Sequence, residues 1–113
     1  MDSYLTEIPE AKFYLQTQRI FLTYRSHLDK KNYSNFLKKK MNGGKSNVVD
    51  IIILAHEKGD KTTSYPHTHV FVKTLKRFQT RNSRYFDYDD IHPHIKSVKS
   101  KKHESNIYRY LAK

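Results

Sequence analysis

Two histidines and a glutamate in the middle of the sequence have the spacing of a metal site. The stretch YPHTHVFV, residues 65–72, holds His67 and His69 at the start of an apolar run, and Glu57 ends the apolar run before it. On a β-strand, residues i and i+2 share a face, so the two imidazoles lie side by side and Thr68 points the other way. Two imidazoles and one carboxylate leave positions open for a substrate oxygen, as catalytic metal sites do.

The available ligand types narrow the choice of metal. The chain has no cysteine, which excludes disulfides and thiolate sites and favours Mg²⁺, Mn²⁺ or another ion that accepts oxygen and imidazole ligands. His56 competes with Glu57, because a shift of one residue in strand register would turn His56 to the site face. His92 and His94 form a second pair without a nearby acidic residue, and we interpret that pair as structural or phosphate-contacting. A chance histidine pair on a half-exposed strand is the alternative for the first pair too.

A tyrosine close to the end of the sequence is a candidate nucleophile. The last residues, IYRYLAK, contain Tyr108, Tyr110 and Lys113. A tyrosine nucleophile needs a nearby cation that favours the phenolate and balances charge on an attacked phosphate. On a helix, Tyr110 and Lys113 lie at i, i+3 on one face, and Tyr108 points nearly the opposite way. The alternative is an amphipathic helix whose tyrosines cover a sheet.

The elements that position these residues follow from hydrophobic patterning. Apolar, β-branched runs predict strands in four segments, which are RIFLTY from Arg19, 48–57, 67–75 and 92–99. Segment 78–88 is ambiguous between a short helix and an extended excursion. A helix is predicted over 26–40, capped by Ser26 or Asp29, with a buried stripe and a stop at NGG, and a second helix over 103–113 buries Ile107 and Leu111. The stripe residues of the first helix are Leu28, Tyr33, Phe36 and Leu37.

This order of elements predicts an α+β domain, an antiparallel sheet with helices against one face. We divide the chain into an N-terminal arm, residues 1–18, and one domain, residues 19–113. The 113 residues carry 22 Lys and Arg against 11 Asp and Glu, a net charge of +11, which favours a nucleic-acid partner. No apolar run reaches transmembrane length and the first residues do not resemble a signal peptide, so we expect an intracellular setting without membrane.

Together these motifs resemble the replication-initiator (Rep) proteins of geminiviruses and related small circular single-stranded DNA elements, which belong to the HUH endonucleases. The resemblance covers about residues 19–113. Arg25 stands where a proline commonly follows the family's first motif, and Thr68 replaces a bulky hydrophobe in the second. The similar segments, in the family's order, are FLTY (21–24), PHTHVFV (66–72), the geminivirus-type segment RFQTRNSRYFD (77–87), HPHIK (92–96) and YLAK (110–113).

The resemblance implies a central antiparallel five-stranded sheet with flanking helices, the ferredoxin/RRM-like HUH endonuclease fold. It also implies a metal-dependent, site-specific DNA endonuclease and strand transferase that nicks and rejoins single-stranded origin DNA through a 5′-phosphotyrosine in rolling-circle replication. His67 and His69 match the metal-binding places, and Glu57 matches the carboxylate if the circovirus loop length is the guide. Tyr110 matches the nucleophile and Lys113 its helper.

The implied partner is the single-stranded DNA of an origin stem-loop. A C-terminal helicase region is expected to be missing from this chain, the isolated domain is expected to be a monomer, and the setting is the host nucleus if the source is a eukaryotic virus. Basic residues would bind phosphates and aromatic residues would stack on bases. The residues that we expect to contact DNA are Tyr24, Arg25, Lys73, Arg77, Arg84, Lys96 and Lys99.

Two other functions fit parts of the sequence. A non-catalytic module that binds single-stranded nucleic acid would use the charge and the aromatics, but it has no use for the pair formed by Tyr110 and Lys113. An HUH transposase or relaxase would use both sites. Relaxases usually carry three histidines in the metal motif, whereas this chain offers two and Glu57. A structural zinc site would need four closed ligands and is the weakest alternative.

Overall fold

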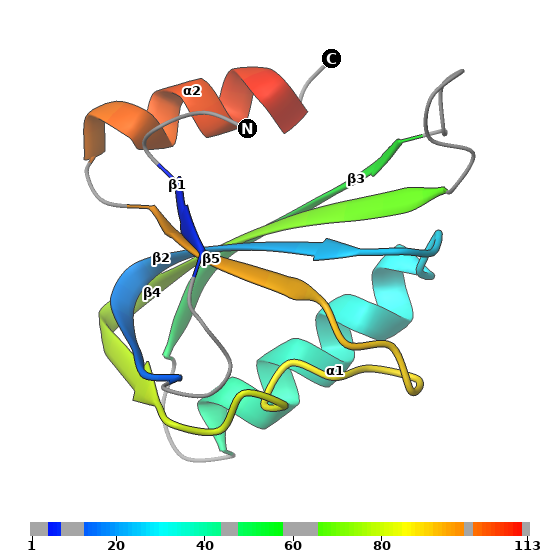
Figure 1. Cartoon of the computed structure of the whole chain (residues 1–113), viewed down its shortest axis with the longest axis horizontal. Helices are drawn as coiled ribbons and strands as arrows, with labels where there is room; N and C mark the ends of the chain where they lie inside the picture. The colour runs from blue at the N-terminus through cyan, green and yellow to red at the C-terminus, as the bar shows by residue number, and fades with distance from the viewer. Residues whose placement is uncertain (1–4, 8–12, 44–47, 58–65, 99–100, 112–113) are drawn as a thin grey trace.

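An antiparallel sheet with one helix on each of its faces makes up the fold (Figure 1). The computed structural model describes residues 5–7, 13–43, 48–57, 66–98 and 101–111. The strand order is β1-β5-β2-β4-β3, and all neighbouring strands are antiparallel. The elements are β1 (Leu5–Glu7), β2 (Leu15–Tyr24), α1 (Lys30–Asn42), β3 (Val49–Glu57), β4 (His67–Thr80), β5 (His94–Val98) and α2 (Lys101–Leu111). The α+β class with an antiparallel sheet is confirmed.

The two helices lie on opposite faces of the sheet, and the prediction that both lie against one face is wrong. Residues of α1 share a buried cluster with Ile20 and Leu22 of β2, whereas residues of α2 share one with Phe21, which projects from the other face of the same strand. A sheet covered on both faces has strands that are apolar on both faces. The apolar run in β2 is therefore continuous in the sequence. Such a run does not indicate whether helices cover one face of the sheet or both.

The helix α1 begins and ends where its capping residues predict. Of the two residues predicted to cap the start of the helix, Asp29 is the N-cap, because its carboxylate accepts a hydrogen bond of 2.8 Å from the backbone N–H of Asn32. Gly43 ends the helix at φ 59°, and its N–H donates to the carbonyl of Lys39 at 3.2 Å. The buried side chains of the helix are Tyr33, Leu37 and Met41, while Leu28 is buried just before it and Phe36 is half-buried.

The beginning of the chain contributes to the sheet and the core. The strand β2 starts at Leu15, which is fully buried, and Phe13 before it is buried as well. The strand β1 pairs with β5, with Leu5 opposite Val98. The boundary predicted at residue 18 therefore falls inside a strand. The stretch LQTQ hides this in the sequence, because polar side chains on its outer face make a half-buried strand resemble a loop.

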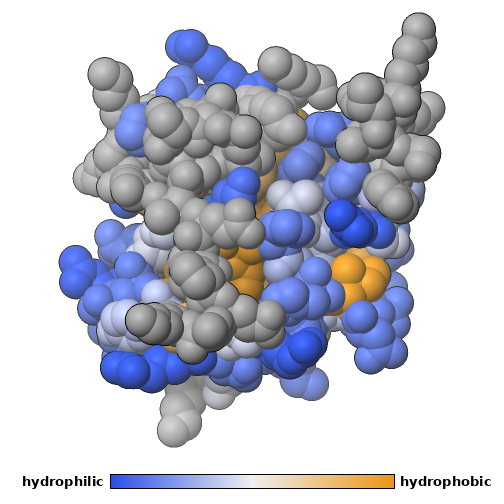
Figure 2. Space-filling model, in the orientation of Figure 1, coloured by the Kyte–Doolittle hydropathy of each residue, from blue (hydrophilic) through white to orange (hydrophobic). Residues whose placement is uncertain are grey.

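The ambiguous segment 78–88 is extended first and then turns. The strand β4 continues to Thr80 after a register shift against β2 between Thr17 and Arg19. A two-residue turn joins Tyr88 to Ile91 further on, and its central residues, Asp89 and Asp90, have φ of 51° and 63°. This segment is not a helix. None of the helices within the described residues is long and apolar enough to span a membrane. The described residues on the face shown in Figure 2 are mostly hydrophilic.

The hydroxyl of Tyr24 is predicted to stabilise the core under α1. Tyr24 is fully buried, and its hydroxyl donates to the carbonyl of Phe86 at 2.6 Å. Tyr24→Phe leaves that carbonyl without this donor, so the free energy of unfolding should fall by about 1–3 kcal/mol. Tyr14→Phe is the matched control, because the Tyr14 hydroxyl bonds Gln79 on an exposed side chain, and it should change stability by less than about 0.5 kcal/mol. Urea unfolding measures both, and equal losses would contradict the assignment.

Candidate active site

The predicted metal ligands lie together on the sheet face that α2 covers in part. In the register of β3 with β4, Glu57 is opposite His67 and Ala55 is opposite His69. Thr23 of β2 is opposite His69 on its other side. Residues opposite each other in an antiparallel pair project from the same face. The sheet therefore brings Glu57, His67 and His69 to one face, near the ends of β3 and β4 that extend beyond α2 (Figure 1).

His69 is the most tightly held member of this group. Its Nε2 atom is 3.2 Å from Oε2 of Glu57, and its Nδ1 atom is 3.2 Å from the hydroxyl of Thr23. The ring of Phe21 stacks on it at 5.6 Å between centroids. The ring of His67 lies parallel to it, with centroids 6.2 Å apart and planes 7° apart. A contact at Nδ1 that orients the ring while Nε2 faces a carboxylate is the arrangement of metal-binding histidines.

The electrostatics of the site keep His69 neutral. Burial disfavours the charged imidazolium and lowers the pKa of His69 below its usual 6.5, and the neighbouring His67 lowers it further. The carboxylate of Glu57 raises the pKa but does not offset the burial. At neutral pH the ring is therefore uncharged, and the neutral imidazole is the form that binds a metal ion.

The donor set suits a divalent cation in its chemistry, and two of its three members already meet. Imidazole nitrogen and carboxylate oxygen together suit Mn²⁺, and Mg²⁺ accepts the oxygen. Glu57 and His69 are in contact, and His67 stands beside His69. Within the described residues, no group of three or more such side chains is yet gathered closely enough to hold a metal ion. The side chain of Glu57 is 51% exposed, so it has room to turn toward both histidines.

The register separates Glu57 from its competitor. His56 is opposite Thr68, on the face that α1 covers. Its Nε2 atom is 2.7 Å from the carbonyl of Leu28, and its ring stacks on His27. Thr68 points away from the histidines as predicted, and its buried hydroxyl donates to the carbonyl of Ser26 at 2.5 Å. The one-residue slip that would exchange His56 for Glu57 is absent from this register.

The helix α2 contains the backbone of the candidate nucleophile. Tyr110 lies one residue before the end of α2, and its side chain and all of Lys113 lie outside the described residues. The rival tyrosine, Tyr108, is described: its hydroxyl donates to Oε2 of Glu104 at 2.9 Å, and its ring meets Phe71 edge-on. Burial, and then the Glu104 carboxylate, raise the pKa of Tyr108 to about 12. The Tyr108 side chain is thus half-buried, and its protonated hydroxyl is bonded to Glu104.

One of the predicted DNA contacts is wrong, and a second residue is engaged in an ion pair within the fold. Tyr24 is fully buried under α1, where its hydroxyl bonds Phe86, so it has no surface on which a base could stack. Lys73 faces α2, and its ammonium is 3.2 Å from Glu104. An aromatic residue at the end of an apolar strand serves a core as well as a binding face. A lysine on a strand does not reveal the carboxylate that folding brings to it.

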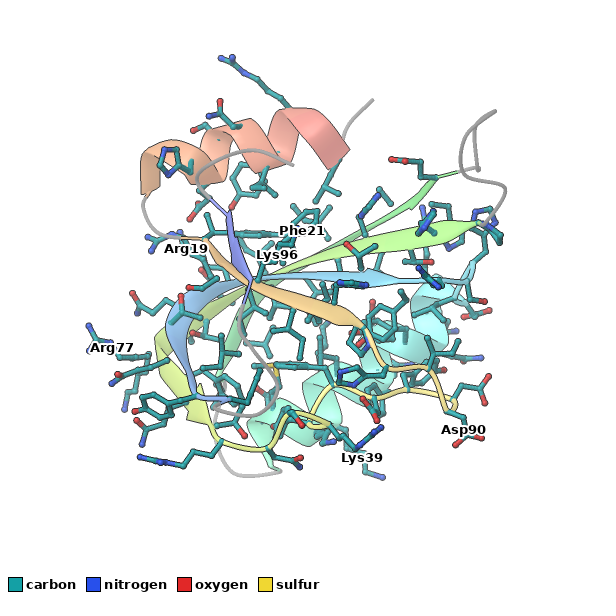
Figure 3. The ribbon with its side chains drawn as sticks, in the orientation of Figure 1. Arg19, Phe21, Lys39, Arg77, Asp90 and Lys96 are labelled. Carbon is teal, nitrogen blue, oxygen red and sulfur yellow. The ribbon has the colours of Figure 1, made fainter. Side chains whose placement is uncertain are left out.

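The other predicted DNA contacts differ in their exposure. Arg25 and Arg77 are exposed, and Figure 3 shows Arg77 extending away from the sheet. Arg84 is exposed and pairs with Asp87 at 3.1 Å. Lys96 is half-buried opposite Phe21, on the face of the histidines. Lys99 lies outside the described residues.

Three residues at the site were not predicted to contact or to flank the metal ligands, although His94 was noted in the second histidine pair. Thr23 and Phe21 contact the His69 ring from β2, and both belong to the FLTY stretch. His94 is opposite Thr23 in the pairing of β2 with β5, so it projects from the same face one strand further on. Alternation along each strand would have found these residues once the register was known. The register is a long-range property that no single stretch of sequence contains.

Comparison with known proteins places the chain in a family. A sequence model of the geminivirus Rep catalytic domain matches residues 13–113. The chain is 31% identical over 91 residues to the replication-associated protein A of Chloris striate mosaic virus, an alignment that covers 80% of this chain and 29% of that protein. It is 29% identical over 102 residues to the replication-associated protein of tobacco yellow dwarf virus (strain Australia), with 89% of this chain and 28% of that protein covered. This chain belongs to the geminivirus Rep catalytic domain family.

The match begins at Phe13, before the domain boundary predicted at residue 19. This agrees with the early start of β2 at Leu15. The alignments cover 29% and 28% of the length of these two curated relatives, so the chain corresponds to a small part of each.

The carboxylate of Glu57 is predicted to control the pKa of His69. Glu57→Gln removes the negative charge that raises this pKa, so the pKa should fall further below 6.5. An NMR pH titration of the histidine Cε1–H signals, without metal, measures the change. Asp50→Asn is the control, because Asp50 lies seven residues earlier on β3, roughly 23 Å away. An unchanged or raised pKa in Glu57→Gln would show that the contact of 3.2 Å does not exist in solution.

Proposed function

We propose that this domain initiates replication by nicking single-stranded DNA at an origin and later rejoining it. The observation that carries the proposal is the contact between Glu57 and His69, with His67 alongside, on the sheet face next to the helix that contains Tyr110. Membership of the geminivirus Rep catalytic domain family supports it. So does the net charge of +11, which attracts a polyanion and makes binding depend strongly on salt.

Each residue of the site has a role in this proposal. Glu57, His67 and His69 would hold the divalent ion, Mg²⁺ or Mn²⁺, which when bound polarises the scissile phosphate. Thr23 and Phe21 fix the plane of the His69 ring, so that its Nε2 atom is already oriented toward the metal position. Lys96, and His94 beyond it, would receive neighbouring phosphates of the strand, since both project from the same face.

Tyr110 would be the nucleophile. Its phenolic oxygen attacks the phosphorus and gives up its proton, the bond from phosphorus to the 3′ oxygen breaks, and the departing 3′ oxygen takes up a proton. The products are a 5′-phosphotyrosine and a free 3′-hydroxyl that primes synthesis. Lys113 would balance the charge on the attacked phosphate. One phosphodiester is exchanged for another, so attack by a 3′-hydroxyl on the phosphotyrosine rejoins the DNA without an external energy source.

The alternatives use the same fold differently. A non-catalytic module would bind the strand across the basic sheet face and form no covalent product. An HUH transposase or relaxase would form the same tyrosine linkage on another DNA sequence. The contact between Glu57 and His69 favours a catalytic domain over a binding module, because a carboxylate aimed at an imidazole adds nothing to phosphate binding.

A covalent adduct is the direct test of the proposed chemistry. The domain is incubated with Mn²⁺ and a labelled single-stranded oligonucleotide that carries a geminivirus-type origin sequence, and a denaturing gel is read for a protein–DNA band. The wild type should form the band and Tyr110→Phe should not, because Phe lacks the nucleophilic oxygen. Tyr108→Phe is the matched control and should keep it. Binding without a band in the wild type on several origins would favour the binding module.

Paired substitutions on β3 test which neighbour is the ligand. Glu57→Ala removes a donor from the site face, so adduct formation in Mn²⁺ should slow by at least about tenfold. His56→Ala is its neighbour on the opposite face and should retain the wild-type rate per folded molecule, with some loss of stability from the lost contact to Leu28. The reverse pattern, a dead His56→Ala and an active Glu57→Ala, would mean that the register of β3 against β4 is off by one residue in solution.

A further inference from the structure

A buried carboxylate attaches α2 to the sheet, outside the group of predicted metal ligands. We call these ligands, Glu57, His67 and His69, the metal-ligand group. Glu104, in the first turn of α2, is 9% exposed. Its Oε1 atom accepts a hydrogen bond of 2.6 Å from Nε of Arg19, and its Oε2 atom lies 3.2 Å from the ammonium of Lys73. Oε2 also accepts the hydroxyl of Tyr108 at 2.9 Å, one turn further along the helix. Both oxygens of one carboxylate are therefore used, by three donors from three elements.

The three donors hold the Glu104 carboxylate in its charged form. Burial alone would raise the pKa of Glu104, but the hydrogen bonds from Arg19, Tyr108 and Lys73 outweigh it, and the pKa lies below its usual value. Charge-assisted hydrogen bonds of this kind are short and directional. Glu104 thus gives α2 a directional attachment to β2 and β4, the two central strands of the sheet.

The apolar contacts of α2 among the described residues do not define one orientation of the helix. Ile107 and Leu111 are buried against Phe21, Phe71 and Val98. Hydrophobic burial is non-directional, so such a contact tolerates a small roll of the helix or a small slide along its axis. An ion pair with two fixed partners does not tolerate such a movement of the helix. Arg19 and Lys73 are opposite each other in the register of β2 with β4, so together they define one position for Glu104 across two strands.

The same strand connects this attachment to the metal-ligand group. Arg19, Phe21 and Thr23 alternate along one face of β2. Arg19 bonds Glu104. Phe21 stacks on the His69 ring, and the hydroxyl of Thr23 contacts the Nδ1 atom of His69. Figure 3 shows Arg19 and Phe21 on the side of the sheet that faces α2. One rigid strand therefore carries both the anchor of α2 and the support of His69.

We propose that Glu104 is a positioning residue for the tyrosine reaction: by binding Arg19 and Lys73 it fixes the roll and axial position of α2, and so the distance from the backbone of Tyr110 to the metal-ligand group. This inference rests on the proposed function. Glu104 acts through α2 and does not touch the DNA. Its bond to Tyr108 has a second effect, because it keeps that hydroxyl inside the fold and leaves Tyr110 as the tyrosine of α2 available to the phosphate.

A buried ion pair is a weak source of stability, which supports a role in orientation. Removing two charges from water costs about as much as their attraction returns, and apolar replacements are often as stable. Apolar residues at positions 19, 73 and 104 could have packed α2 against the sheet without any charge. Three charged side chains stand there instead, and they fix one orientation at the end of the helix opposite Tyr110.

Single-turnover kinetics separate positioning from folding. Wild type, Glu104→Gln and the control Asp29→Asn are mixed with saturating origin oligonucleotide and Mn²⁺, and the adduct is followed in time. The amplitude reports the fraction of active molecules and the rate constant reports the geometry in each of them. Glu104→Gln should keep a dissociation constant for the oligonucleotide within about twofold of wild type while its rate constant falls by roughly 10- to 100-fold, the cost of a misplaced reactive group. Asp29→Asn removes a carboxylate from the cap of α1 with no loss of capping and should react as wild type does.

The outcomes distinguish the two proposals. A rate constant within twofold of wild type, or a loss confined to the amplitude, overturns the positioning role and leaves the proposed function intact. No adduct from wild type overturns both. If Glu104→Gln does not fold, Lys73→Met is the second variant, because it removes one donor and keeps the bond to Arg19. Its rate constant should fall by roughly 3- to 10-fold, the effect of a smaller misplacement. An unchanged rate constant for Lys73→Met overturns the positioning role.

Mass spectrometry of the linked peptide identifies which tyrosine carries the DNA. Any linkage to Tyr108 should occur in Glu104→Gln and not in wild type.

Discussion

The pairing of β2 with β4 is the constraint on which the rest of this structure depends. It places Thr23 opposite His69, Phe21 opposite Phe71 and Arg19 opposite Lys73. A shift of one residue would move every one of these side chains to the other face of the sheet. Because both faces are apolar in the middle of these strands, hydrophobic burial alone does not choose between the two registers.

Polar contacts at the two ends of the strands make that choice. On the α1 face, the hydroxyl of Thr68 bonds Ser26 and Leu28, and the hydroxyl of Tyr24 bonds Phe86. On the α2 face, Arg19 and Lys73 share Glu104. A slipped register would leave each of these groups buried without its partner, at a cost that a buried polar group does not recover. The apolar residues supply the driving force, and the polar ones select the register.

Period-two alternation was enough to predict that His67 and His69 share a face and that Thr68 does not, because it depends only on strand geometry. The same rule correctly left Glu57 and His56 as alternatives, since only the pairing with β4 decides between them. The placement of both helices on one face failed for the opposite reason. Continuous apolar strands are compatible with one covered face or with two, and nothing local in the chain distinguishes them.

Among the predicted DNA contacts, the surroundings of Tyr24 and Lys73 have the same long-range origin. Lys73 and Glu104 are 31 positions apart in the chain, and Tyr24 and Phe86 are 62 apart. The charge or aromaticity of a residue is visible in the sequence, but its partner is not. Arg77 and Arg25 are exposed in the structure, whereas Lys73 is half-buried beside Glu104, and the sequence alone does not distinguish these two outcomes.

The two faces of the sheet divide the work of the domain between them. The α1 face is closed by a large cluster that contains Tyr33, Leu37 and Phe86, and its polar groups serve the fold. The cluster under α2 is smaller, and Figure 1 shows the ends of β3 and β4 extending beyond this helix. On that face Glu57 is paired with His69, and Glu104 with Arg19 and Lys73. The Glu104 carboxylate is balanced by its two cationic partners, whereas the imidazole partner of Glu57 is neutral and supplies no balancing charge. The fold therefore holds two kinds of carboxylate on this face: one whose charge is balanced within the protein, and one whose charge is available to a bound cation.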